Sequence, residues 1–326
     1  MRPDPVPHPT TAVAAAPPLR ARRRRPLSVG RVARGSVPYL LVAPVVIAIG
    51  TILGYPLYHL VTLSFQRYGL FQLIAHQGTW IGLDNYRTLF HDHVFWATLQ
   101  RTIVFTIINV GLTMVLGTLI ALLLVRVSGW VRVLITSGLV LAWAMPVVVA
   151  VQVWYWMTNY ENGVLNYMLT KLGIGDFVQH DWYATPTSAL GITTSLIVWG
   201  AIPFVTITVY AGLAQVPGDL FEAAAVDGAG AFRVFRDVTF PVLKPIFLIL
   251  TSLSIIWDFG VFTQPFLLLN SRPNEDYYLM SIYLYEKSIG IHEYGLGSAI
   301  AIVMVGIMLV LSFFYVRQMV RMGEVR

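Results

Sequence analysis

The sequence predicts an all-α integral membrane protein with six transmembrane helices. Only 12% of its 326 residues are charged and 56% are hydrophobic, and the mean hydropathy is +0.68. Soluble domains average about 25% charged residues, so a soluble fold of this length would lack half of its usual solvating surface. The composition therefore excludes a soluble protein. The positions of the charges also carry more information than their net sum of +6.

Six runs reach the length of roughly 20 apolar residues that is needed to cross the hydrocarbon core of a bilayer. Asp258 is the only Asp, Glu, Lys or Arg inside them. Pro146 and the other prolines in these runs predict kinks, which membrane helices tolerate. The runs are apolar on every face, which is typical of helices and not of the alternating strands of a membrane barrel. The predicted spans are residues 37–64, 102–125, 133–160, 182–218, 245–270 and 295–316.

The distribution of basic residues predicts that both termini are cytoplasmic. Sixteen Lys and Arg residues fall on the side of the termini and six on the opposite side, which is the positive-inside pattern. Residues 1–36 are rich in proline and hold eight arginines, so we expect a disordered basic tail. Within it, Arg22–Arg25 is interpreted as a topology anchor and not as a nucleic-acid site. The transmembrane domain then covers residues 37–318, and 319–326 form a second short tail.

No motif for catalysis or metal binding is found. The chain has no cysteine, which excludes disulfides, thiolate metal sites and a cysteine nucleophile. Its only lysines are Lys171, Lys244 and Lys287, and none follows a glycine, so the phosphate-binding loop of an ATPase is missing. The triplet at 91–93 holds two histidines and an aspartate but has no further obvious ligands. We expect no enzymatic activity and no metal site in this chain.

Residues 216–245, between the fourth and fifth spans, predict a helix–turn–helix on the cytoplasmic side. Asp219 and Glu222 have the spacing of an N-cap and its N3 partner, so a short helix should start there. The Asp227-Gly228 pair should end that helix, and a second short helix is expected around 231–237.

The first of these helices presents small residues, Ala223 to Ala225, at an exposed tip. Small side chains let another backbone approach closely, which favours a docking element for a cytoplasmic partner. The alternative is an ordinary loop that happens to be helical. Arg233 and Arg236 in the second helix either pair with that partner or simply complete the positive-inside pattern.

The same segment resembles the EAA loop of ABC importer permeases. That family usually has Ile and Leu where this chain has Val238 and Phe240, and both changes are conservative. The matching positions are Glu222, Ala223, Ala224, Asp227, Gly228, Ala229, Phe235 and Pro241.

Further matches are similar to the maltose-type carbohydrate-uptake branch of these permeases, and the resemblance covers roughly residues 38–316. One departure is Ser271-Arg272-Pro273, where the family often has Gly-Gly-Pro, and it concerns an outward-facing loop that would contact a receptor. The matching positions are residues 80–86, Phe95-Trp96, Asn162-Gly163, Leu165-Asn166, Trp199, Pro203-Phe204 and residues 294–299.

The resemblance implies a type I ABC importer permease fold with a cytoplasmic EAA coupling helix, in a prokaryotic cell membrane. It implies a second homologous permease, a dimeric cytoplasmic ATPase that holds ATP and Mg, and an extracytoplasmic solute-binding protein. No cofactor is expected in this chain and no nucleic acid partner, whereas membrane lipid surrounds it. Glu222 would offer its charge to the ATPase, or would only cap its helix. The implied coupling residues are Glu222, Ala223, Ala224, Asp227, Gly228, Phe235 and Pro241.

A substrate path is implied around Asp258. A charge inside a span is costly unless it faces water or a partner, and the aromatic residues beside it could stack on the C–H faces of a sugar. Alternatively, Asp258 is a structural partner of a neighbouring helix and Trp257 is packing. The resemblance places the sugar path at Gly200, Phe204, Ser254, Trp257 and Asp258.

The leading functional hypothesis is the translocation subunit of an ATP-driven importer of a di- or oligosaccharide. An ABC permease for another polar solute, such as glycerol phosphate, is one alternative. The other is an ion-coupled secondary transporter, which would require discontinuous helices and inverted repeats in one chain.

Overall fold

The computed structural model describes residues 29–269 and 274–323. Two predicted features therefore lie outside the described residues: most of the basic tail, at 1–28, and the Ser271-Arg272-Pro273 sequence. The chain forms two compact units, residues 1–56 and 57–326, which are described separately.

The described part of the first unit, residues 29–56, is one continuous helical segment. It holds α1 (Val29–Ile49), the π-helical turn η1 (Gly50–Gly54) and the start of α2 (Tyr55–Ser64). The stretch Tyr39–Ser64 is long and apolar enough to cross a membrane. Helix α1 begins at Val29, so residues 29–36, which the sequence places in the tail, are helical.

The regular elements described in the second unit are helices, apart from one short pair of strands in which β1 (Gln66–Arg67) lies antiparallel to β2 (Thr79–Trp80). Its helices up to residue 213 are α3 (Leu70–Ala75), α4 (Asp84–His91), α5 (His93–Arg126), α6 (Gly129–Trp143), α7 (Val147–Met157), α8 (Val164–Lys171) and α9 (Pro186–Leu213). The later elements are α10 (Gly218–Val226), α11 (Ala231–Val234), η2 (Phe235–Thr239), α12 (Phe240–Phe259), α13 (Thr263–Leu268), η3 (Glu275–Tyr277), α14 (Met280–Tyr285), η4 (Glu286–Gly290) and α15 (Tyr294–Gly323).

Five helical segments of the described chain can cross a membrane, and a sixth span is formed only if α6 and α7 are counted together. These two helices meet at an angle of 98°. Pro146 stands at the break, where it lacks the N–H that would continue the helix and its ring would clash with the preceding turn. The predicted kink in the third span is thus a full break. The fifth predicted span is also interrupted, because α12 ends at Phe259 and α13 starts at Thr263.

Helices α5 and α9 pack closely around small and polar residues. A Cβ atom added to Gly117 would lie 2.7 Å from Val205 Cγ1, so only glycine allows this approach. Thr206 donates a hydrogen bond from Oγ1 to the Gly117 carbonyl oxygen, at 3.1 Å. Small residues at close crossings are typical of helix pairs in membranes, where packing and not the hydrophobic effect drives association.

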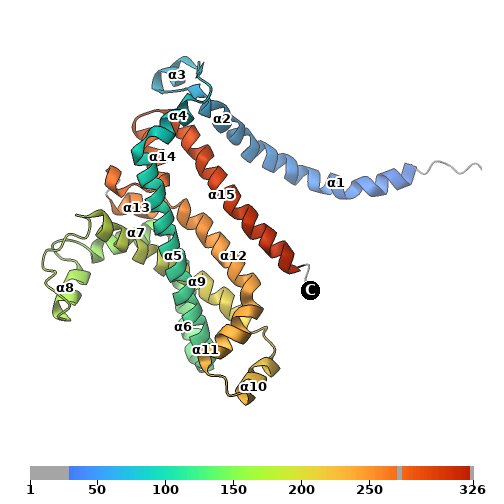
Figure 1. The fold of residues 1–326 in the computed structure, drawn as a ribbon, viewed down its shortest axis with the longest axis vertical. Helices are drawn as coiled ribbons and strands as arrows, with labels where there is room; N and C mark the ends of the chain where they lie inside the picture. The colour runs from blue at the N-terminus through green and yellow to red at the C-terminus, as the bar shows by residue number, and fades with distance from the viewer. Residues whose placement is uncertain (1–28, 270–273, 324–326) are drawn as a thin grey trace, which may run out of the picture. The chain divides into compact units, whose positions relative to one another are not determined.

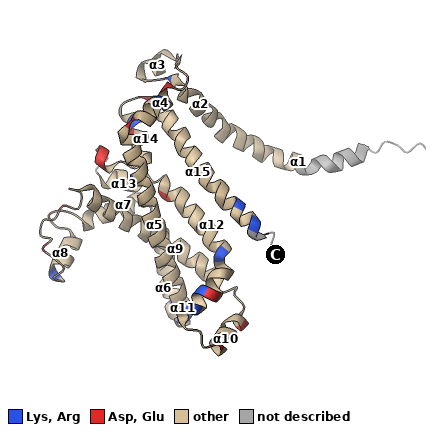
Figure 2. Ribbon diagram, in the orientation of Figure 1, with Lys and Arg blue, Asp and Glu red and all other residues tan. Residues whose placement is uncertain are grey.

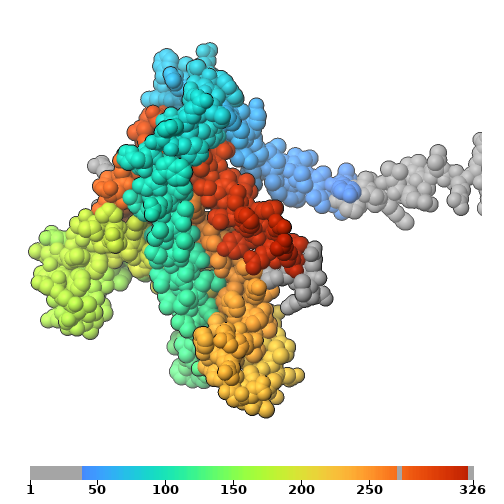
Figure 3. All heavy atoms as spheres, viewed as in Figure 1, coloured from blue at the N-terminus to red at the C-terminus, as the bar shows by residue number. Residues whose placement is uncertain are grey.

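Within residues 57–326, Figure 1 shows α3, α4 and α14 gathered at one end of the long helices and α10 and α11 at the other. Charged residues lie mainly near these ends, whereas the shafts of α5, α9 and α12 are almost free of them (Figure 2). The segment around α8 stands out from the rest of this unit in the space-filling view (Figure 3). The ends with α3 and α10 are called the outer end and the coupling end below.

Candidate functional site

A cavity of about 300 Å³ lies between the break of α6 and α7, the middle of α9 and the last turn of α12. Four of the five residues predicted for the substrate path line it together: Gly200, Phe204, Trp257 and Asp258. The fifth, Ser254, is buried one helical turn before Asp258 and is not among the lining residues.

Aromatic side chains form one wall of this cavity. The rings of Trp143 and Phe204 are stacked with centroids 6.2 Å apart and planes at 20°. Phe204 in turn contacts Trp257, with centroids 5.5 Å apart. Trp257 keeps 53% of its surface exposed, so packing within the described chain does not cover its indole ring. Three rings from three different helices thus offer flat faces to one space.

Asp258 supplies the only carboxylate of the cavity lining. Asp258 is buried, with only 7% of its surface exposed. Within the described residues no hydrogen bond or ion pair engages this carboxylate, although buried charges are ordinarily paired. The alternative structural role of Asp258, as partner of a polar group on a neighbouring helix, stays a prediction.

Sequence reasoning did not assign Trp143 or Trp199 to the path, yet both line the cavity, as does Gln264. Trp199 packs against Trp154, with ring centroids 4.9 Å apart, and Trp154 donates a hydrogen bond to Ser195 Oγ at 2.9 Å. Trp143 reaches the cavity only because α6 stops at that residue. No periodicity in the third apolar run could have revealed this, whereas the break itself had a signal in Pro146.

The coupling segment, residues 216–244, forms the coupling end. Its first helix, α10, begins at Gly218 with Pro217 as N-cap and without a side-chain cap. The predicted capping by Asp219 is therefore wrong, because the extended backbone at Pro217 sets the start of the helix two residues earlier. Asp219 lies instead in the first turn, where an acidic side chain interacts favourably with the positive end of the helix dipole.

The predicted end of α10 is confirmed. Asp227 is the C-cap residue, and Gly228 has a φ of +68°, a left-handed conformation that favours glycine. The Ala229 amide donates to the Ala224 carbonyl oxygen at 2.9 Å and closes the turn. The second helix starts at Ala231, as predicted, but continues through the π-helical η2 into α12 without a break.

The exposed face of the coupling segment carries Glu222, Ala223, Asp227, Gly228 and Pro241, while Ala224 and Phe235 are half-buried. Phe221 and Phe235 hold the segment by packing against the buried cluster around Leu213 and Leu243. At the exposed surface, Arg236 pairs with its neighbour Asp237, with Nε 2.7 Å from Oδ1. The segment thus presents a small acidic helix on an apolar base.

At the outer end, Asp92, the middle residue of the triplet at 91–93, has a structural role. Its Oδ1 caps α5 by accepting from the Val94 amide at 2.8 Å, and its Oδ2 accepts from Tyr283 Oη at 2.8 Å. Lys287 Nζ lies 3.7 Å from the same Oδ2. Partial burial alone would raise the pKa of Asp92, but the hydrogen bonds from Tyr283 and Val94 and the charge of Lys287 together hold it below its ordinary value.

The similarity of this chain to known proteins identifies its family. Residues 113–322 match the family described as binding-protein-dependent transport system inner membrane component. The chain belongs to this family. More than half of the residues matched lie in the helices α5, α9, α12 and α15 and the coupling segment that connects α9 to α12.

Several permeases of known systems are similar to this one over most of their length. The diacetylchitobiose uptake system permease protein DasB of Streptomyces coelicolor is 41% identical over 287 residues, which cover 88% of each chain. The trehalose/maltose transport system permease protein MalF of Thermococcus litoralis is 33% identical and covers 72% of this chain and 77% of its own. The sulfoquinovosyl glycerol transport system permease protein SmoG of Agrobacterium fabrum is 31% identical over 85% of this chain and 88% of its own.

A solved structure of a bacterial alginate ABC transporter, in complex with an alginate pentasaccharide-bound periplasmic protein, contains a similar chain. It superposes with a TM-score of 0.73 at 21% identity and covers 88% of this permease and 94% of that chain. This similarity confirms the predicted fold, that of a type I ABC importer permease.

Proposed function

We propose that this permease is the translocation-pathway subunit of an ATP-driven importer of di- or oligosaccharides. Support comes from its relatives, since those at 41% and 33% identity are named for the uptake of diacetylchitobiose and of trehalose or maltose. The cavity described above has the chemistry that such substrates require.

The observation that carries the proposal is the unpaired carboxylate of Asp258 beside three aromatic rings. Aromatic faces stack on the C–H surfaces of sugars, and a carboxylate accepts hydrogen bonds from hydroxyl or acetamido N–H groups. Burial of Asp258 without a partner is costly, and a sugar donor would offset that cost. We place substrate against Phe204, Trp257 and Asp258, with Gly200 leaving room on the facing helix.

Ser254 lies four residues before Asp258 in α12, nearer the coupling end. We assign it to the part of the path that substrate enters after it leaves the cavity. The same carboxylate disfavours an anionic solute such as glycerol phosphate, because Asp258 would repel it.

Coupling to ATP is assigned to the exposed face of the coupling segment. Glu222 offers a charge to a basic residue of a dimeric cytoplasmic ATPase, and Gly228 permits the turn beneath it. Ala223, Ala224, Asp227, Phe235 and Pro241 shape the docking surface or hold it. ATP and Mg belong to that partner, and this chain needs no cofactor of its own.

The remaining parts of the importer follow from the family, whose members serve binding-protein-dependent systems. A second homologous permease supplies the other half of the path, and an extracytoplasmic solute-binding protein delivers the sugar. The positive-inside pattern supports a cytoplasmic position for both termini and the coupling end in a prokaryotic cell.

The test is purification of the chain from its own membranes with its co-purifying partners, followed by transport assays in proteoliposomes. We expect a second permease and an ATPase, ATP-dependent uptake of a di- or oligosaccharide, and loss of at least about tenfold in uptake for Asp258→Asn with the complex intact. Glu161→Gln, a change of an exposed acid outside the cavity, is the control.

Uptake without ATP would replace the proposal by secondary transport, and preferred uptake of glycerol phosphate would replace the substrate class. Loss of folding in Asp258→Asn would assign this residue to structure.

A further inference from the structure

The cavity beside Asp258 contains a negative charge but no positive one. Asp258 is the only acidic residue of its lining, and no Lys, Arg or His is among the lining residues of the described chain. Apart from the indole N–H groups, the remaining polar side chain of the lining is Gln264. Its amide is neutral and cannot balance a carboxylate. This half of the path therefore attracts positive charge.

The carboxylate of Asp258 requires a strong partner. The residue is 7% exposed, and no ion pair or hydrogen bond within the described residues reaches its side chain. A buried carboxylate without a partner is costly. A cation offsets this cost better than a hydroxyl or amide group, because it adds Coulomb attraction to the hydrogen bond where little water is present to weaken it.

The aromatic rings of the same cavity attract positive charge as well. Trp143, Phe204 and Trp257 form a connected wall, with neighbouring ring centroids 6.2 and 5.5 Å apart. Trp257 directly precedes Asp258 in α12. The faces of aromatic rings have a negative potential and bind ammonium groups, tryptophan most strongly. A carboxylate beside exposed aromatic rings thus suits a ligand that carries an ammonium group.

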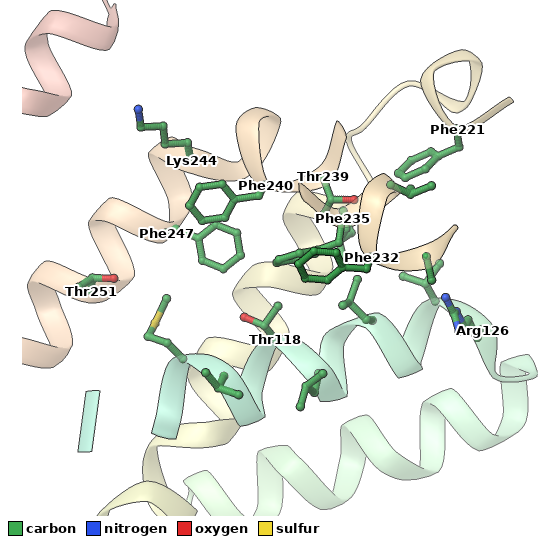
Figure 4. Close-up of a pocket in the computed structure, with 18 of the residues that line it drawn as sticks. Thr118, Arg126, Phe221, Phe232, Phe235, Thr239, Phe240, Lys244, Phe247 and Thr251 are labelled. Carbon is green, nitrogen blue, oxygen red and sulfur yellow. The ribbon is translucent and has the colours of Figure 1, made fainter. Parts of the chain in front are cut away.

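A larger pocket at the coupling end has the opposite character. It is an open groove of about 1170 Å³ between α5 on one side and α11, η2 and α12 on the other. No Asp or Glu is among its described lining residues, and its charged members are Arg126 and Lys244, which lie on opposite sides of Figure 4. The two pockets therefore differ in the charge that they accommodate, and a cationic ligand suits the one at Asp258.

We propose that the cavity at Asp258 selects sugars that carry a free ammonium group, which pairs with this carboxylate while the sugar ring stacks on Trp257 or Phe204. The inference rests on the proposed function and narrows its substrate class to amino sugars. A cavity of about 300 Å³ is at the lower end of the range for small-molecule sites. A sugar ring on its aromatic wall therefore brings its substituents close to the carboxylate.

Two other partners for Asp258 fit less well. A basic residue of the sister permease would have to lie inside a membrane span, where Lys and Arg are costly and rare. An acetamido N–H of a neutral sugar offers a hydrogen bond but no charge, so it leaves the buried carboxylate uncompensated. Both alternatives predict that a free ammonium group gives no advantage in binding.

The test compares two disaccharides with the same ring skeleton. Chitobiose, the disaccharide of glucosamine, has free amines, whereas the amines of N,N′-diacetylchitobiose are acetylated and neutral. Each is titrated against the purified complex of the chain with its co-purifying permease and ATPase, without binding protein, in mildly acidic buffer that keeps the free amines protonated. Binding raises the midpoint of thermal unfolding, and ammonium chloride at matched concentration controls for salt.

We expect chitobiose to reach half of its maximal stabilisation at a concentration at least about tenfold lower than N,N′-diacetylchitobiose does. Asp258→Asn removes the charge at constant size and should bring the two concentrations together, whereas Asp258→Glu should keep the preference. Gln264→Met, a change without charge in the same cavity, should leave the ratio of the two concentrations unchanged. Glu161→Gln, which removes an exposed acid outside the cavity, should affect neither sugar.

Equal or tighter binding of the acetylated sugar by the wild-type complex would overturn the inference and leave the proposed function standing, since a disaccharide would still bind. This comparison also decides the matter if Asp258→Asn does not fold. An ammonium preference that persists in Asp258→Asn would overturn the inference too, because the charge would then be recognised elsewhere. Stabilisation by neither sugar would overturn both the ammonium preference and the sugar cavity on which it rests.

Discussion

Apolar packing holds both ends of residues 57–326, and the outer end adds polar contacts that the coupling end lacks. At the outer end, polar contacts connect segments that are distant in sequence. Asn85 Nδ2 donates to the carbonyl oxygens of Ser64 and Gln66 at 2.8 and 2.9 Å, and Arg101 Nη1 donates to the Tyr278 carbonyl oxygen at 2.8 Å. At the coupling end, no side-chain hydrogen bond within the described chain connects residues 216–244 to another segment, so apolar packing and the continuous helix into α12 hold them.

This difference distinguishes an outer end with a fixed geometry from a coupling end that can shift. Directional hydrogen bonds fix one geometry, since a displaced donor or acceptor would be left unsatisfied. Apolar contacts are not directional, so a segment that rests on Phe221 and Phe235 can shift without breaking a polar network. The two ends should therefore respond differently to mutation, with stability concentrated at the outer end and coupling at the other.

The largest difference is expected between two Phe→Ala changes. Phe95 at the outer end is 1% exposed and sits among Phe90, Trp96 and Tyr283, so its truncation should cost about 3–5 kcal/mol of unfolding free energy. Phe235 is half-buried beside an open groove, and its truncation should cost about 1–2 kcal/mol. Denaturation in mixed micelles measures the unfolding free energy of both variants. Equal losses would contradict the difference between the two ends.

The second effect concerns Asn85, which is 9% exposed. Asn85→Ala leaves two backbone carbonyl groups without their donor, at a cost of about 1–3 kcal/mol. The same change at the exposed Asn162 should be nearly neutral. If both variants unfold at the wild-type denaturant concentration, the polar frame contributes nothing to stability.

A smaller effect is expected at Asp92, and it depends on pH. Because its pKa in the folded protein is below the ordinary value of 3.8, the charged form stabilises the fold above that value, and this contribution is lost as the pH falls through the lowered pKa. Asp92→Asn should lower stability by roughly 1 kcal/mol near neutral pH and by less in acid. Thermal unfolding of both proteins across the acid range checks this, and a pH-independent difference would point to packing instead.

The smallest effect on stability should accompany Glu222→Ala at the coupling end. Glu222 is exposed, and alanine favours the helix, so the unfolding free energy should change by no more than about 0.5 kcal/mol. Affinity for the co-purifying ATPase should nevertheless fall about tenfold, which a pull-down titration measures. Asp219→Ala on the same helix is the matched control, and equal weakening by both changes would show that Glu222 has no specific partner.

Much of this architecture could be predicted because the bilayer imposes it. Long uncharged runs such as 102–125 must be helical to satisfy their backbone groups in lipid. The turn at Asp227-Gly228 was predictable as well, since its chemistry is local.

What could not be predicted depends on contacts between distant segments. Trp143 enters the cavity beside Asp258 through the angle between α6 and α7. The pocket at the coupling end is lined by α5 and α11, which are more than 100 residues apart in the chain. The start of α10 was missed by two residues because Pro217 and Asp219 offer competing signals, and backbone geometry at the proline prevailed.

The break at Pro146 has a consequence for how the protein enters the membrane. Helix α6 has 15 residues and α7 has 11, and each is shorter than the roughly 20 residues that cross the hydrocarbon core. The backbone groups freed between them can be tolerated only against protein or water. This segment therefore depends in the bilayer on later parts of the chain, since α9 contacts both halves and α13 contacts α7. A nascent chain that ends near residue 160 should expose the segment to the aqueous side, and one that includes α9 and α13 should bury it.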